Sequence, residues 1–165
     1  MTVRWWAGRT RQFVRYVTGR VTRAERLDLA EWLTPNLINL FDQMHRADQR
    51  HGLDVVAALR RAGHTDRDLL TAGLLHDCGK GRDLRVWHRI GWSLTDCYGG
   101  RIGALVLRLP TFRTAFATVA AHAEASADLT LAAGCSALTA DLIRHQSEPT
   151  DPELGVALLL ADEAS

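Results

Sequence analysis

Apolar residues recur at intervals of three and four positions along most of the chain, with polar residues between them. This period gathers apolar side chains on one face of an α-helix, and no stretch alternates strictly over the length of a β-strand. The pattern therefore predicts an all-α domain. The segments predicted to be helical are 9–18, 22–32, 35–44, 46–62, 66–77, 83–97, 101–108, 111–122, 127–133, 136–147 and 151–163.

Glycine and proline support several of these boundaries. Pro35 favours the first turn of one helix, Gly63 ends another, and Pro152 is expected just inside the last one. Six glycines and a proline interrupt the chain between residues 79 and 110. Such a segment is typical of a loop that faces a substrate, and equally of a plain connection between two helical layers.

The composition indicates one soluble domain. A chain of 165 residues with 47% hydrophobic and 24% charged residues is long enough for one sizeable core. No apolar run approaches the roughly 20 residues of a membrane span, and the arginine-rich N-terminus lacks the apolar core of a signal peptide. We therefore expect a cytoplasmic protein. Its three cysteines form no C-x-x-C pair and are predicted to be reduced thiols.

The distribution of charge adds two features. The net charge of +1 argues against a DNA-binding surface. Seven arginines lie in the first 26 residues, on what is either a solvated helix face or a surface that docks on a membrane or a partner. The only lysine of the chain, Lys80, stands between two glycines, which suggests a role for its compact and mobile ammonium group.

Four ionisable side chains are predicted to point into the core. By helical periodicity, His51 and Asp162 share faces with apolar residues, and the adjacent pair His76 and Asp77 extends the apolar stripe of its helix. Burying such groups is costly unless something satisfies them. A single inward histidine is explained by a hydrogen bond in the core, and a polar pair at a helix end by capping. Four such groups together favour a metal ion.

The chemistry of these four side chains limits the choice of metal. Two neutral imidazoles and two carboxylates form a mixed nitrogen and oxygen ligand set that suits Fe, Mn, Co, Ni or Zn. Their positions on helices would hold them rigidly. The sequence therefore predicts a divalent transition metal, as one or two ions.

The order of these residues resembles a known family. His51, then His76-Asp77, then Asp162 is similar to the H…HD…D signature of the HD-domain superfamily of metal-dependent phosphohydrolases. The segment LLTAGLLHDCGKG closely resembles the helix and turn of that family, and RHGLDVVAALRRAG and ALLLADEAS resemble its flanking helices. The resemblance implies a compact HD-domain helical bundle over residues 46–165. Residues 1–45 are then expected to form an N-terminal helical extension packed on the core.

Two further histidines bear on the number of ions. His122 and His145 fall where binuclear branches of the family place two more ligands, and both can lie on apolar helix faces. The order H, HD, H, H, D is similar to that of bacterial HD hydrolases that cleave diadenosine tetraphosphate symmetrically. It also resembles part of the HD-GYP pattern, whose G-Y-P residues this chain lacks. Alternatively, each histidine supports the ligands from behind or packs in the core.

The resemblance implies specific roles. Asp77 would bridge two ions, and a metal-bound hydroxide would attack phosphorus, so that Asp77 is catalytic and no protein nucleophile is needed. One ion would be held by His51, His76 and Asp162, and the other by His122 and His145. Lys80 is predicted to be catalytic by donating to a phosphate oxygen. The remaining candidates for binding substrate, each equally explained by simple solvation, are Arg82, Arg85 and Arg144.

The sequence thus predicts a metal-dependent phosphohydrolase that acts on a nucleotide or another small phosphoester. Two alternatives stay open. One is a mononuclear nucleotidase that uses only His51, His76, Asp77 and Asp162. The other is a non-catalytic HD-like module that binds a nucleotide or a partner protein and keeps the metal for folding.

Overall fold

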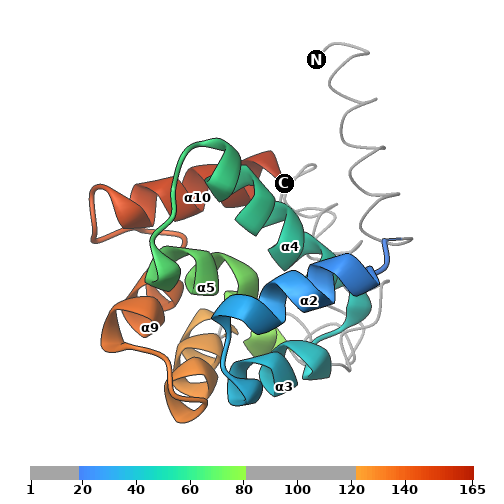
Figure 1. Ribbon diagram of the computed structural model, residues 1–165. Helices are drawn as coiled ribbons and strands as arrows, with labels where there is room; N and C mark the ends of the chain where they lie inside the picture. Colours follow the sequence, from blue (N-terminus) through green and yellow to red (C-terminus); the bar gives the residue numbers. More distant parts are fainter. Residues whose placement is uncertain (1–18, 81–121) are drawn as a thin grey trace, which may run out of the picture.

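The computed structural model describes residues 19–80 and 122–165, and this part of the chain is helical without a β-strand. The all-α prediction is confirmed there. The elements in chain order are α2 (Arg23–Trp32), α3 (Pro35–Gln43), α4 (Arg46–Arg61), α5 (Arg67–Leu75), the 3-10 turn η1 (Cys78–Lys80), the helical residues 122–132, α9 (Ala137–Arg144) and α10 (Leu154–Ala164) (Figure 1). The predicted helices 9–18, 83–97 and 101–108, and nearly all of 111–122, lie outside the described residues.

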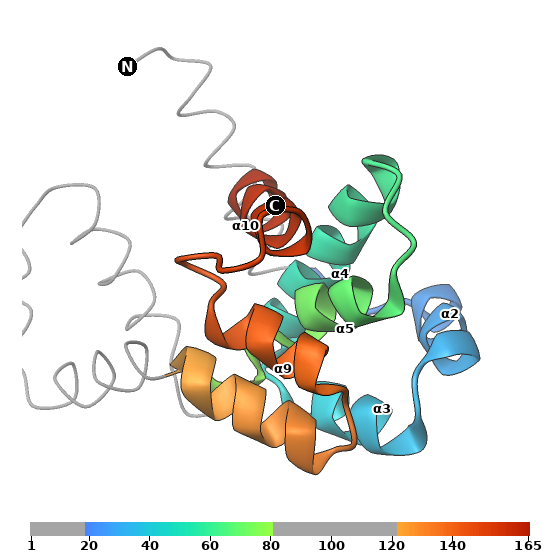
Figure 2. The same cartoon turned by 90° about the vertical axis from the view of Figure 1, so that its left-hand side faces the viewer.

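Helix α5 lies at the centre of the bundle. Every residue from Leu69 to Leu75 is buried, and a helix that is apolar on all sides must be covered on all sides. It packs against α4, α9 and α10, and α10 also packs against α4. Figure 2 shows α9 beside the helical residues 122–132, which form a further layer. The end of α5 is therefore enclosed by several elements that are distant in sequence.

One apolar cluster runs through the described helices. It includes Leu29 of α2, Phe41 of α3, Val55 of α4 and Leu158 of α10, all nearly inaccessible to solvent. Helices α2 and α3 therefore contribute their buried side chains to the same core as α4 and α5. Arg50 reinforces this junction, because its guanidinium binds Glu25 of α2 at 2.7 Å.

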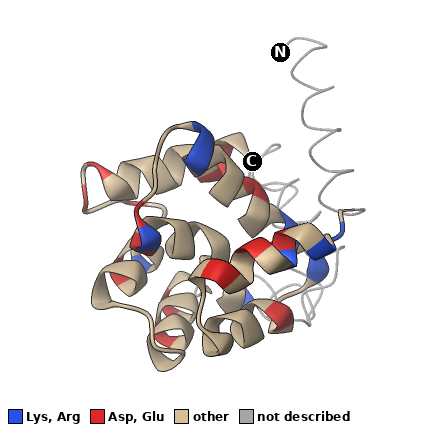
Figure 3. Cartoon of the chain, viewed as in Figure 1, with Lys and Arg blue, Asp and Glu red and all other residues tan. Residues whose placement is uncertain are grey.

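Charged residues of both signs are interspersed on the outside. Figure 3 shows acidic and basic positions alternating along α2. Two ion pairs join α2 to neighbouring helices: Arg26 contacts Asp42 of α3 at 2.7 Å, and Arg60 of α4 contacts Asp28 at 2.9 Å. Among the helices of the described segments, none has both the length and the apolar character that crossing a bilayer requires.

Three predicted helices differ by two or three residues at one end. The helix predicted over 66–77 ends at Leu75, and the one predicted over 136–147 ends at Arg144. The last helix begins at Leu154 rather than at residue 151. An aspartate turn precedes the helix, because Asp151 Oδ1 accepts the N–H groups of Glu153 and Leu154 at 2.9 and 2.7 Å. Pro152 consequently precedes the helix.

The predicted helix over 127–133 is longer at its start. Residues 123–126, expected to separate two helices, are helical and continuous with the rest of 122–132. The interval contains Ala123 and Ala125, which are strong helix formers, and neither glycine nor proline. His122 and Ser126 therefore belong to one helix and are one turn apart.

Candidate metal centre

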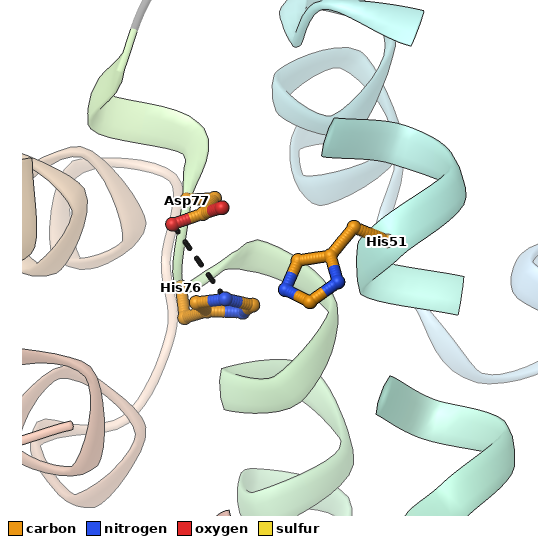
Figure 4. Close-up of side chains that lie close together, drawn as sticks. All are labelled: His51, His76 and Asp77. Atoms are coloured by element: carbon orange, nitrogen blue, oxygen red, sulfur yellow. Dashed lines mark ion pairs between the residues drawn. The ribbon is translucent and has the colours of Figure 1, made fainter. Parts of the chain in front are cut away.

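Four side chains from three helical segments converge at the end of α5. His51 comes from α4, Asp162 from α10, and His76 and Asp77 directly follow the last residue of α5. One ligand atom each from His51, His76 and Asp77 lie within 4.8 Å of one another (Figure 4). Asp162 Oδ1 joins them, at 2.7 Å from His51 Nε2 and 3.4 Å from His76 Nε2. The four residues predicted to point inward thus meet at one place.

A glycine allows the first two elements to come this close. A Cβ atom at Gly52 would lie 2.3 Å from the carbonyl oxygen of Leu74, far inside contact distance. That oxygen belongs to the backbone of α5, so no side-chain rotation can make room. Gly52 follows His51, and Leu74 lies two residues before His76. The close crossing of α4 and α5 therefore brings the two imidazoles together.

His76 is held in one tautomer. Its Nδ1 lies 3.0 Å from the carbonyl oxygen of Gly73, which can only accept, so Nδ1 carries the proton. In the neutral ring, Nε2 then presents a lone pair. This atom faces Asp77 Oδ1 at 3.6 Å and Asp162 Oδ1 at 3.4 Å. A nitrogen lone pair and two carboxylate oxygens would thus repel one another, and only a cation or a proton between them removes this repulsion.

The two oxygens of Asp77 have different surroundings. Oδ2 accepts a hydrogen bond from Lys80 Nζ at 2.6 Å. Oδ1 is the buried side-chain atom that has no hydrogen-bond partner among the described residues. It lies 3.4 Å from His122 Nε2 and 3.6 Å from His76 Nε2. Leaving a buried acceptor unsatisfied costs about 1–3 kcal/mol, so this oxygen marks the position where a cation fits.

The pKa values of His76, Asp77 and Asp162 are all shifted in the direction that favours positive charge at the cluster. Burial acts to raise the pKa of Asp77, but Lys80 and His76 outweigh it and hold that pKa well below its usual range. Burial also acts to raise the pKa of Asp162, which hydrogen bonds from His51 and His76 lower instead. For His76, burial acts to lower the pKa, and the carboxylates of Asp77 and Asp162 raise it to about 9. A proton on His76 therefore supplies part of the positive charge that the two carboxylates favour at this place.

The two additional histidines are placed differently. His122 lies beside the cluster through the 3.4 Å approach of its Nε2 to Asp77 Oδ1. The structure does not bring His145 into it. His145 directly follows the last residue of α9, and its Nε2 lies 3.5 Å from Asp141 Oδ1. The predicted helix included residue 145, but α9 ends at Arg144. Helical periodicity therefore does not fix the direction of the His145 side chain.

The predicted phosphate-binding residues are only partly described. Lys80 is at the site, with its ammonium on Asp77 Oδ2. Arg144 is occupied elsewhere, because its Nε contacts both carboxylate oxygens of Glu124 at 3.0 and 2.9 Å and its Nη2 lies 3.3 Å from Asp128. Arg82 and Arg85 lie outside the described residues.

Two polar side chains that support the site were not predicted. Gln146 Nε2 lies 3.4 Å from the carbonyl oxygen of His76, and Ser126 Oγ accepts the N–H of Gly79 at 2.8 Å. Ser126 follows His122 by one helical turn, so extending the face of His122 along a continuous helix would have found it. Gln146 follows the end of α9, where periodicity gives no signal.

Comparison with known proteins identifies no relative: no protein-family model, no curated protein and no solved structure matches this chain.

Replacing Gly52 with alanine is expected to separate α4 from α5. The clash with the Leu74 backbone should lower the free energy of unfolding by about 1–3 kcal/mol, as overpacking usually does. Urea unfolding measures this loss. Nuclear Overhauser contacts between the rings of His51 and His76, whose centroids lie 5.2 Å apart, should weaken at the same time.

Gly63→Ala is the matched control for Gly52→Ala. Gly63 has a φ of +93° and open space around its Cβ position, so alanine there costs about 1 kcal/mol of backbone strain without touching another helix. The ring contacts should survive in this variant. Unchanged ring contacts in Gly52→Ala would show that the crossing of α4 and α5 does not set the site.

Proposed function

We propose that this protein is a metal-dependent phosphohydrolase in which His51, His76, Asp77 and Asp162 hold one divalent transition-metal ion. One observation carries the proposal: His76 Nε2 lies 3.6 Å from the unsatisfied Asp77 Oδ1 and 3.4 Å from Asp162 Oδ1. No donor of the described residues satisfies Asp77 Oδ1 there. A cation would satisfy all of these atoms at once.

The donor set fits such an ion. Nitrogen and oxygen ligands together suit Fe, Mn, Co, Ni or Zn. The hydrogen bond from His76 Nδ1 to the Gly73 carbonyl is the usual partner of a metal-binding histidine, since it fixes the ring and its tautomer. The short bond from Lys80 to Asp77 Oδ2 leaves Oδ1 available to the ion.

Phosphoester hydrolysis is supported by the resemblance to the HD-domain superfamily and by the charge of the cluster. When bound, a divalent ion supplies charge neutralisation at a phosphoryl group and activates water for hydrolysis. Lys80 reduces the negative charge that Asp77 and Asp162 would otherwise present to an incoming anion. Asp162, with 37% of its side chain exposed, leaves one side of the cluster open to a substrate. We propose a nucleotide or another small phosphoester of the cytoplasm.

The number of ions is a separate point. The described ligands suffice for one ion, and the contact between His145 and Asp141 favours this mononuclear form. The binuclear arrangement stays a prediction, in which His122, already beside Asp77, would be joined by His145. Two equivalents of tightly bound metal per chain would establish the binuclear form, and one equivalent the mononuclear form.

Elemental analysis of freshly purified protein, followed by a phosphate-release screen, tests the proposal. The screen covers nucleotides, dinucleoside polyphosphates and small phosphoesters with Fe, Mn, Co, Ni and Zn added separately. We expect bound metal and turnover that chelation abolishes. Tight metal binding without turnover on any substrate would favour the non-catalytic module, and the absence of metal binding would contradict the proposal altogether.

A further inference from the structure

The helical residues 122–132 bury polar side chains and expose apolar ones. Ser126 and Thr130 are completely inaccessible to solvent, whereas Leu129 and Leu131 are 43% and 41% exposed. This is the reverse of the usual amphipathic pattern. His122, Ser126 and Thr130 follow one another at intervals of four, so they share one face of the helix. Ser126 and Thr130 are buried on this face, and its small side chains allow another segment to approach closely.

The segment that approaches is the turn carrying the metal ligands. A Cβ atom at Gly79 would lie 2.6 Å from the backbone nitrogen of Ser126 and 2.7 Å from the carbonyl oxygen of His122. The N–H of Gly79 donates to Ser126 Oγ at 2.8 Å, and Cys78 Sγ donates to the Ser126 carbonyl at 3.7 Å. The turn therefore rests directly on the helix backbone, and the serine hydroxyl is its buried anchor.

We propose that Ser126 is a positioning residue for the metal centre: its hydroxyl fixes the turn on the helix and thereby sets the distance between Asp77 and His122. Asp77 lies two residues before the anchored Gly79. His122 lies one helical turn before Ser126, with its Nε2 3.4 Å from Asp77 Oδ1. Two hydrogen bonds join the turn to the helix, and the one to the Ser126 hydroxyl is much shorter than the 3.7 Å contact of Cys78 Sγ with the Ser126 carbonyl. Losing the shorter bond therefore lets Asp77 and His122 shift relative to each other. The inference rests on the proposed metal site.

Thr130 supplies a matched control on the same face. Its hydroxyl is as completely buried as that of Ser126, but it lies 3.0 and 2.8 Å from carbonyl oxygens of its own helix, those of Ser126 and Ala127. Replacing it with valine removes a buried hydroxyl without removing a bond to the turn. Any loss of metal affinity that is specific to Ser126 must then come from the contact with Gly79.

The test is a titration of the metal-free proteins with Mn²⁺, with the free ion followed by electron paramagnetic resonance well below the unfolding temperature. Ser126→Ala should bind Mn²⁺ about tenfold or more weakly than wild type, the usual cost of removing a partner that orients a ligand, and Thr130→Val should stay within about twofold. Ser126→Cys keeps a weaker acceptor of similar size, so its Mn²⁺ affinity should lie between those of Ser126→Ala and Thr130→Val. This variant also serves as the test if the alanine variant does not fold. Exchange of the Gly79 amide proton should accelerate in Ser126→Ala and not in Thr130→Val.

The outcomes separate the two proposals. If wild type binds Mn²⁺ and Ser126→Ala binds it as tightly as Thr130→Val does, the positioning role is overturned while the metal site stands. If wild type binds neither Mn²⁺ nor another of the candidate metals, the proposed function fails and the inference fails with it. A specific loss in Ser126→Ala, with faster exchange at Gly79, supports the role.

Discussion

Asp77→Asn is expected to abolish metal-dependent phosphate release and to weaken metal binding by more than about 100-fold. This loss exceeds the roughly 10- to 100-fold that follows from removing a residue which only orients a ligand. Asparagine keeps the volume of the side chain but removes the charge that the ion requires at Oδ1. Metal ions supply several kcal/mol of charge stabilisation in such reactions, so the rate should fall by a factor on the order of 1,000 or more. Metal titration and phosphate release on the same preparations measure both effects.

The same substitution should also destabilise the metal-free protein. Lys80, with only 21% of its side chain exposed, would lose its carboxylate partner, and so would the protonated ring of His76. Breaking a buried ion pair from one side costs about 3–5 kcal/mol, which urea unfolding in the presence of a chelator would detect.

Asp128→Asn is the matched control for Asp77→Asn. The chemical change is identical, but Asp128 is 66% exposed and pairs with Arg144 away from the cluster. Metal affinity and turnover should remain those of wild type. Wild-type metal affinity in Asp77→Asn would contradict the assignment of Asp77 as a ligand, and with it the proposed function.

The four side chains that the sequence predicted to point inward lie on helices, or at their ends, where periodicity gives a direction. His51 is inside α4 and Asp162 is inside α10, so the apolar residues that share their faces fix which way they point. His76 directly follows the last turn of α5, so the periodicity of that helix still predicts its direction. Asp77 was placed correctly for a partly wrong reason. It lies beyond the helix, and the 3-10 turn that follows directs it toward the histidines.

The candidates that the structure does not bring to the cluster lie where contacts between elements decide the outcome. Arg144 points toward Glu124 and Asp128, and these residues reach it only because the helical residues 122–132 pack beside α9. His145 follows the end of its helix, so helical periodicity no longer applies. Gly52 gave no signal either, since a close crossing depends on what lies opposite. Local patterns predicted the elements and the four converging side chains, whereas tertiary contacts determined which other side chains join them.

The stability of the metal-free protein is expected to fall by roughly 3 kcal/mol as the pH rises from 6.5 to 9, because His76 has an ordinary pKa of 6.5 that the folded cluster raises to about 9. Protonated His76 stabilises the folded state against the charges of Asp77 and Asp162. This contribution is complete below pH 6.5 and is lost as the pH passes 9. The lowered pKa values of the two carboxylates matter only in acid, so they leave this window unaffected.

Bound metal should remove this pH dependence. An ion on Nε2 excludes the proton, so the folded, metal-loaded protein and the unfolded chain both carry neutral His76 between pH 6.5 and 9, and the free energy of unfolding stays level. Below pH 6.5 only the unfolded chain takes up the proton, and the loaded protein then loses stability. Urea unfolding across this range, with chelator or with metal at a fixed free concentration, measures the two curves.

His76→Gln should flatten the metal-free curve. That result would assign the slope to this ring rather than to the other titratable groups that face it, namely Asp77, Asp162, Lys80 and His51. Burial raises the pKa of the buried Cys78 thiol to about 12 and that of the partly buried Cys135 thiol to about 11. These thiols affect stability only near and above pH 9, because an unfolded thiol ionises at about that pH. The measurement therefore stops there. Parallel curves with and without metal would mean that the ion does not displace the His76 proton, and the site would have to be assigned to other ligands.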